Sequence, residues 1–201
     1  MHHQTIRILV FCTFAVLSAL SIAKEQYQTL SSPKNLPQFA LKDHSGERFD
    51  LSNLKGHWSL MFMGFTSCPD VCPITLLKLE GVRAELSLRF TPEKIPNVIF
   101  LAVDPVRDRP TLQSYLTHFH PENIGITGDK TQLDILVGGI DGFYRLEKPK
   151  YNNAYYDVTH AASISVINPL GQLVAQISPP FIVQPMADFL TRLIRQGGGH
   201  E

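Results

Sequence analysis

Apolar and polar positions along most of this chain follow two patterns, one typical of buried strands and one typical of helices. Residues 58–65 and 97–103 are continuous apolar runs, as expected for strands covered on both faces of a sheet. Residues 73–89 carry apolar side chains at near-helical spacing and predict the helix that follows the first strand. Buried strands that alternate with helices predict an α/β sandwich.

Shorter signals complete the expected order of elements. We expect a leading hairpin over 38–51, helices over 110–119, 129–140 and 181–195, a short strand or turn at 124–127, and a closing hairpin over 162–178 with its turn at 168–171. Asp129 is a candidate N-cap for the helix that follows it. Residues 142–159 are polar but rich in tyrosine, so we expect an ordered loop or hairpin there.

The amino terminus has a different pattern. Residues 6–23 are almost wholly apolar or small, with Arg7 the only charge, and Ala23 ends a stretch suited to a signal peptidase. We interpret 1–23 as a cleaved export signal. An uncleaved membrane anchor is the alternative, although the apolar run after Arg7 has 16 residues and a span needs roughly 20. Either interpretation places the protein in an oxidising space: the periplasm, the outer face of the inner membrane or an equivalent intermembrane compartment.

The rest of the chain is long enough for one domain with a substantial core. We expect a polar linker at 24–35, the domain at 36–196 and a disordered tail at 197–201. Lys plus Arg and Asp plus Glu are equal at 18 each, and no run of like charges stands out. This balance argues against a nucleic-acid partner, which a basic stripe would indicate.

The number and spacing of the cysteines limit the kinds of reaction or binding site that the domain can have. Cys12 lies in the leader, so the mature domain keeps only Cys68 and Cys72, and they are either a redox couple or a pair of metal ligands. Both stand where a buried strand turns into a helix, whose N-terminus favours thiolate, so we expect the pKa of at least one to fall. Their C-x-x-x-C spacing predicts one shared helix face, where thiolates would select Cu(I) or zinc. A Cys68–Cys72 disulfide would need only a modest backbone adjustment.

Residues 65–73, Phe-Thr-Ser-Cys-Pro-Asp-Val-Cys-Pro, closely resemble the corresponding segment of the Sco/SenC family of copper-binding thioredoxin-like proteins. Residues 103–108, 119–121, 124–128 and 156–160 are similar to further segments of the same family. The resemblance covers about 36–196. It implies a thioredoxin-like sandwich with a central mixed sheet flanked by helices and an N-terminal hairpin extension.

The resemblance also implies a site and a function. The site would hold one copper ion per chain on Cys68, Cys72 and His160, as Cu(I) or, with a further ligand, as Cu(II). Independently of the resemblance, the place of Asp104 at the carboxyl end of the neighbouring strand predicts that it orients a ligand, with a cap or turn role before Pro105 as the alternative. The function would be a metallochaperone for the binuclear copper centre of cytochrome c oxidase. It would deliver copper to the copper-centre subunit, reduce that centre's cysteines, or do both, and a second copper chaperone is a further expected partner. The family is usually anchored in a membrane, which an uncleaved leader would provide.

Two other functions share this fold and compartment. An exported thiol–disulfide oxidoreductase would use Cys68 and Cys72 as a redox-active pair. A peroxidase of the peroxiredoxin type would need an activated cysteine with an arginine near the peroxide. The C-x-x-x-C spacing and the matched His160 favour the copper protein over a general reductant.

Overall fold

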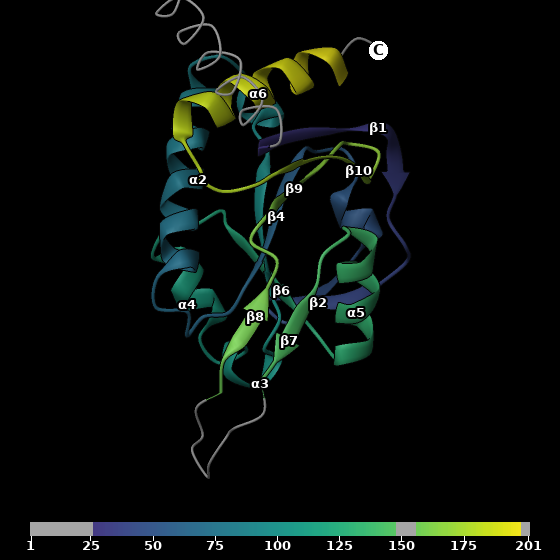
Figure 1. The fold of residues 1–201 in the computed structure, drawn as a ribbon, viewed down its shortest axis with the longest axis vertical. Coiled ribbons are helices and arrows are strands. Elements are labelled where there is room, and N and C mark those ends of the chain that lie inside the picture. The colour runs from purple at the N-terminus through teal and green to yellow at the C-terminus, as the bar shows by residue number, and fades with distance from the viewer. Residues whose placement is uncertain (1–25, 148–155, 198–201) are drawn as a thin grey trace, which may run out of the picture.

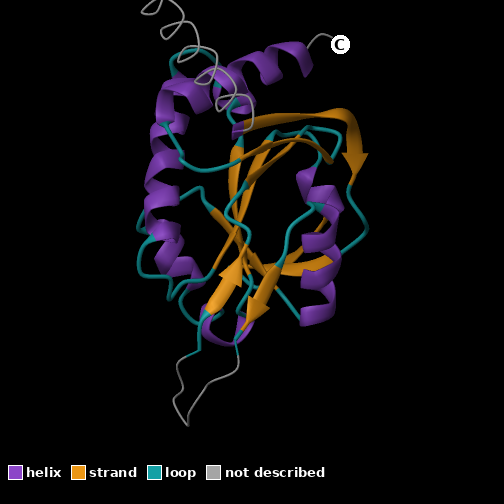
Figure 2. Cartoon of the chain, viewed as in Figure 1, coloured by secondary structure: helices purple, strands orange, loops and turns teal. Residues whose placement is uncertain are grey.

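The computed structural model describes residues 26–147 and 156–197, and within these ranges one eight-stranded sheet lies between helices on both faces (Figures 1 and 2). The strands of this sheet are β1 (Tyr27–Asn35), β2 (Ala40–Asp43), β3 (Arg48–Asp50), β4 (Ser59–Gly64), β5 (Asn97–Ala102), β6 (Ile124–Thr127), β9 (Ile164–Ile167) and β10 (Gln172–Ile177). A separate two-stranded sheet consists of β7 (Tyr144–Leu146) and β8 (Val158–His160). The helices are α2 (Val71–Ser87), α3 (Pro105–Asp108), α4 (Leu112–Thr117), α5 (Lys130–Gly139) and α6 (Val183–Gly197), with 3-10 turns η1 (Leu51–Leu54) and η2 (Pro92–Lys94).

The strand order in the large sheet is β1-β10-β9-β4-β5-β6-β2-β3. Strands β4, β5 and β6 run parallel to one another, and the remaining neighbours pair antiparallel. The parallel pairs arise because helices connect these strands, whereas the antiparallel neighbours β2–β3 and β9–β10 are joined by short turns. The sheet is therefore mixed, as the family resemblance implied.

Strand β4 divides the core into two layers because successive side chains point to opposite faces. Leu60 and Phe62 belong to the layer under α2, α4 and α6, and Met61 and Met63 belong to the layer under α5. Figure 1 shows α2 and α5 on opposite sides of the sheet. All six residues of β4 are buried, which explains why the sequence there is a continuous apolar run.

Most of the expected elements are present, with shifted ends. The hairpins over 38–51 and 162–178 form, and Asp129 caps α5 by accepting from the backbone N–H of Gln132 at 3.0 Å. The helix expected at 110–119 is confirmed as the shorter α4, whereas the short helix α3 before it was not expected.

The region expected as a linker at 24–35 also differs. Residues 27–35 form β1, which pairs antiparallel with β10 and has a register shift between Thr29 and Lys34. Polar residues suit this strand because it is the edge of the sheet and its outer face meets solvent.

The expected hairpin over 142–159 is present as β7 and β8, and residues 148–155 between them lie outside the described ranges. The leader predicted at 1–23 and the tail beyond Gly197 also lie outside them. Among the residues that are described, no helix is both long and apolar enough to span a membrane.

Candidate metal and thiol site

The candidate site lies at one edge of the large sheet, where two parallel strands end. Gly64 at the end of β4 is the register partner of Ala102 at the end of β5. The loop after β4 carries Cys68, and the loop after β5 leads into α3, so both loops leave the sheet side by side. The carboxyl ends of parallel strands are where α/β proteins place binding groups.

The two cysteines lie close together but differ in exposure. Cys68 lies in the loop before α2 and is partly exposed, whereas Cys72 lies in the first turn of α2 and is only 1% exposed. The backbone N–H of Cys72 points to the Cys68 sulfur at 3.5 Å. The expectation that both lie on one helix face is therefore wrong for Cys68, although the pair is brought together. Both thiols are free, and the Cys68–Cys72 disulfide stays a prediction.

Burial decides the acidity of Cys72. Burial raises the pKa of its thiol well above the usual value, and the neighbouring Cys68 adds to this rise. A hydrogen bond from the backbone of Phe65 opposes the rise only in part. The expected fall in pKa is thus not found at Cys72, because the loss of hydration outweighs the field of the helix N-terminus.

His160 is the last residue of β8 and lies opposite Tyr144 of β7. Its Nδ1 is 2.9 Å from the carbonyl oxygen of Ala161. A carbonyl only accepts, so Nδ1 carries the proton, and in the neutral ring Nε2 keeps its lone pair. A ligating histidine is typically prepared in this way.

Phe65 contacts both His160 and the cysteine loop. Its ring meets the imidazole edge-on, with 6.2 Å between the centroids, and its carbonyl accepts from the Cys68 N–H at 3.1 Å. Within the described ranges, no three His, Cys, Asp or Glu side chains are grouped closely enough to hold a metal ion. The structure therefore brings Cys68 and Cys72 together but does not group His160 with them closely enough to hold a metal ion.

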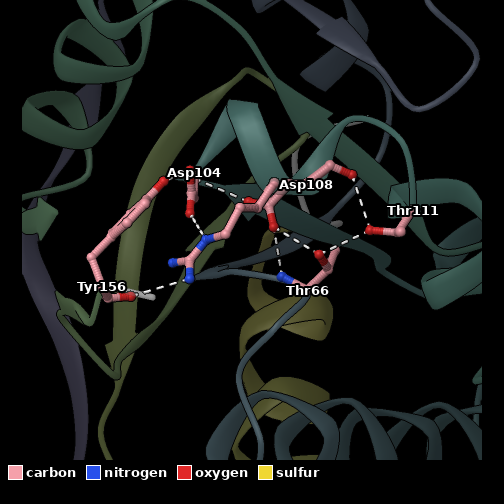
Figure 3. Close-up of polar contacts among 6 residues, drawn as sticks. Thr66, Asp104, Asp108, Thr111 and Tyr156 are labelled. Carbon is pink, nitrogen blue, oxygen red and sulfur yellow. Dashed lines mark hydrogen bonds and ion pairs between the residues drawn. The ribbon is translucent and has the colours of Figure 1, made fainter. Parts of the chain in front are cut away.

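A buried carboxylate on α3 fixes the loop that carries the cysteines (Figure 3). Asp108 accepts from the backbone N–H of Thr66 at 2.7 Å and from its hydroxyl at 2.9 Å. Its second oxygen accepts from the N–H of Asp104 at 3.0 Å. Burial raises the pKa of Asp108, and the bonds from Thr66 oppose that rise. Thr66 also contacts the Thr111 hydroxyl at 3.0 Å, which ties the loop to the start of α4.

Asp104, the residue expected to orient a ligand, is fully buried at the start of α3. Its carboxylate accepts from the Tyr156 hydroxyl at 2.7 Å and from Arg107 Nε. Asp104 is the N-cap residue of α3 by position, but its side chain makes no capping hydrogen bond to the backbone of that helix.

Several residues of this site lie in the segments that resemble the family, but the sequence did not predict their contacts here: Phe65, Thr66, Arg107, Asp108 and Tyr156. The signal that could have found one of them is the spacing of Asp104 and Asp108. Two acidic residues four positions apart, directly after a buried strand, predict carboxylates on one helical turn at the edge of the sheet.

Comparison with protein families gives one clear match. A sequence model described as SCO1/SenC matches residues 28–195. A SCO2-like protein of Rickettsia conorii is 33% identical over 76% of this chain and 73% of its own length. The mitochondrial SCO1 homologue of Homo sapiens is 32% identical over 77% of this chain, which corresponds to 51% of the human protein.

Solved structures agree with the sequence comparison. The copper-bound ScoI of Arabidopsis thaliana superposes with a TM-score of 0.73 and 27% identity, over 80% of this chain and 98% of that one. The copper-bound yeast Sco1 superposes with a TM-score of 0.73 and 28% identity, over 81% of this chain and 90% of that one.

Proposed function

The chain belongs to the SCO1/SenC family and has its thioredoxin-like fold, and from that premise we propose that it is a copper-binding protein of cytochrome c oxidase assembly. The observation that carries the proposal is the pairing of Cys68 with Cys72 at the carboxyl end of β4. Thiolates prefer Cu(I) among the metals available to such a site. Two of the similar solved structures hold copper.

The proposed ligands are Cys68, Cys72 and His160, with one copper ion per chain as cargo. The donor set fits copper, because two sulfurs and the free Nε2 of His160 supply soft and borderline ligands. The histidine has to come closer to the cysteines than it lies in this structure. We propose that metal binding draws His160, at the end of β8, toward the cysteines.

Anaerobic titration of the reduced protein with Cu(I) tests this proposal. We expect one ion per chain, near-complete loss of binding in Cys68→Ser and Cys72→Ser, and weaker binding in His160→Ala. His118→Ala is the matched control, because His118 is exposed and lies outside the proposed site. Unchanged affinity in His160→Ala would show that the three-ligand site is wrong.

The difference in exposure between the cysteines favours a second role, reduction of a disulfide in the partner's copper centre. In that reaction the more exposed Cys68 attacks one partner sulfur as thiolate and forms a mixed disulfide. Cys72 then attacks Cys68, which leaves a Cys68–Cys72 disulfide here and two thiols on the partner. The two electrons come from the pair of thiols, so no other reductant is needed.

Turnover on a model disulfide separates this role from copper delivery. If delivery is the main role, turnover is slow and transfer of bound copper to the copper-centre subunit is fast. Fast turnover that survives His160→Ala would favour a thiol–disulfide oxidoreductase instead. Rapid consumption of peroxide would favour the peroxiredoxin-type alternative.

We further propose that the protein works outside the cytoplasm, in the periplasm or an equivalent compartment, with the copper-centre subunit of cytochrome c oxidase as its partner. The support is the apolar segment at 6–23 and the small residues Ser21 and Ala23 at the two positions that a signal peptidase recognises. Fractionation of cells followed by amino-terminal sequencing distinguishes the cases. A mature protein beginning at Lys24 indicates cleavage, an intact leader in the membrane fraction indicates an anchor, and cytoplasmic protein contradicts export.

A further inference from the structure

The ribbon of β7 and β8 carries His160, and among the described residues its strands pair only with each other. A two-stranded ribbon is marginally stable by itself. Contacts with the rest of the domain therefore determine where His160 lies. On β7, the Tyr144 hydroxyl donates to Asp134 of α5 at 2.9 Å. On the side of β8, Val158 packs against the core layer under α5 and His160 contacts Phe65, while the polar contacts come from α3 and the residue before it.

Tyr156, just before β8, is held by α3 at both its side chain and its backbone. Its hydroxyl donates to the buried Asp104 at 2.7 Å, and its carbonyl accepts from Arg107 Nη1 at 3.1 Å (Figure 3). The Arg107 guanidinium also lies over the Tyr156 ring, 4.0 Å from its centroid, and its Nε donates to the second oxygen of Asp104. A stacked and hydrogen-bonded arginine of this kind has little freedom to move.

Arg107 also contacts Phe65, which lies in the loop that carries Cys68. Its guanidinium carbon is 5.5 Å from the centroid of the Phe65 ring, which in turn meets the ring of His160. The backbone of Phe65 accepts from the N–H of Cys68. Phe65 therefore contacts Arg107, His160 and the cysteine loop at once.

We infer that Arg107 and Tyr156 are positioning residues for the copper site, which set the approach of His160 to the cysteines through Asp104 and Phe65. This inference rests on the proposed copper-binding function. The same turn of α3 holds the cysteine loop through Asp108 and Thr66, so α3 is the common support for both halves of the site. Arg107 and Tyr156 limit where β8 can lie, and this reduces the entropy lost when His160 joins the cysteines.

The test compares Cu(I) affinity in Arg107→Gln, Tyr156→Phe and Arg109→Gln. We expect Arg107→Gln to weaken binding by about 10- to 100-fold, the usual effect of removing a group that orients a ligand. Tyr156→Phe keeps the ring and loses only the hydroxyl, so its effect has the same direction and is smaller. Arg109→Gln is the matched control, because it removes the same charge from an exposed neighbour, and its affinity stays at the wild-type value.

A double-mutant cycle with His160→Ala separates positioning from general damage. We expect Arg107→Gln to have no further effect once His160 is absent, because its route to the metal is then lost. In the Cu(II) form, Arg107→Gln should also weaken the imidazole-nitrogen coupling in electron paramagnetic resonance. If Arg107→Gln fails to fold, the same cycle with Tyr156→Phe gives the answer.

Two results would overturn the inference: the same loss of affinity with and without His160, or wild-type affinity in both Arg107→Gln and Tyr156→Phe. Failure of the wild-type protein to bind Cu(I) is a different outcome. It would remove the proposed function itself and the inference with it.

Discussion

Gly64 offers a test of how tightly the core supports the cysteine pair. It is the last residue of β4, and an added Cβ would lie 2.6 Å from Phe100 Cε2, 2.7 Å from Phe100 Cζ and 2.9 Å from the Cys72 sulfur. Ordinary contact begins at 3.4 Å, so the ring and the sulfur would both have to move. We therefore predict that Gly64→Ala destabilises the protein.

The size of the effect follows from how little room the neighbours have. Phe100 is fully buried and packs edge-on against Phe62, with 5.0 Å between the ring centroids, and at a tilt against Tyr115, with 5.8 Å between the centroids. Overpacking of such a core costs about 1–3 kcal/mol. For a chain of this length, that cost corresponds to a fall in Tm of roughly 2–12 °C. Displacement of the Cys72 sulfur should also weaken Cu(I) binding.

Gly138→Ala is the matched control. Gly138 lies within α5, and an added Cβ meets no atom within 4 Å. Replacing a helical glycine by alanine should stabilise the protein by up to about 1 kcal/mol. Urea unfolding followed by far-ultraviolet circular dichroism measures both variants. A Gly64→Ala midpoint at or above the wild-type value would refute the packing argument, and the Gly138→Ala control would show whether the method resolves changes of this size.

Three further predictions concern titration and hydrogen bonding. Because burial raises the pKa of Cys72, the metal must displace the proton of this thiol at neutral pH. Cu(I) affinity measured by chelator competition should therefore fall by at least about tenfold per pH unit from pH 8 to 6. An affinity that does not change with pH would contradict this. The Ser52 hydroxyl and backbone lower the pKa of Asp50 to about 2, so the ionised form stabilises the fold above pH 4 and this contribution is lost as the pH falls through about 2. Nuclear magnetic resonance should give that midpoint, and a midpoint near 4 would contradict it. Thr66→Val removes one donor to buried Asp108 and should cost about 1 kcal/mol in urea unfolding, whereas an unchanged midpoint would show that the bond contributes nothing.

The strands and helices of the core were predictable because their signal is local. The apolar run at 58–65 and the near-helical spacing at 73–89 predict β4 and α2 within a few residues. The strand at 27–35 was missed because an edge strand with a solvent-facing side has little apolar signal. Its partner β10 lies far along the chain, and local pattern does not report such pairing.

The site was predictable to a lesser degree. The spacing of Cys68 and Cys72 marked them as a reactive pair, and only the family resemblance selected His160. The acidity of Cys72 was not predictable, because it depends on how deeply the side chain is buried and not on its place at a helix N-terminus.

By itself, the sequence determined the order of elements, the cysteine pair and the segment that carries the third proposed ligand. The tertiary structure alone decided that Asp108 supports Thr66 and that Arg107 and Tyr156 meet beside Phe65. These partners are distant along the chain. Thr66 and Asp108 meet because β4 and β5 end in register at one edge of the sheet, and Tyr156 joins them through its bonds to Asp104 and Arg107. Periodicity reports which face of an element is buried, whereas the register between strands decides which loops become neighbours.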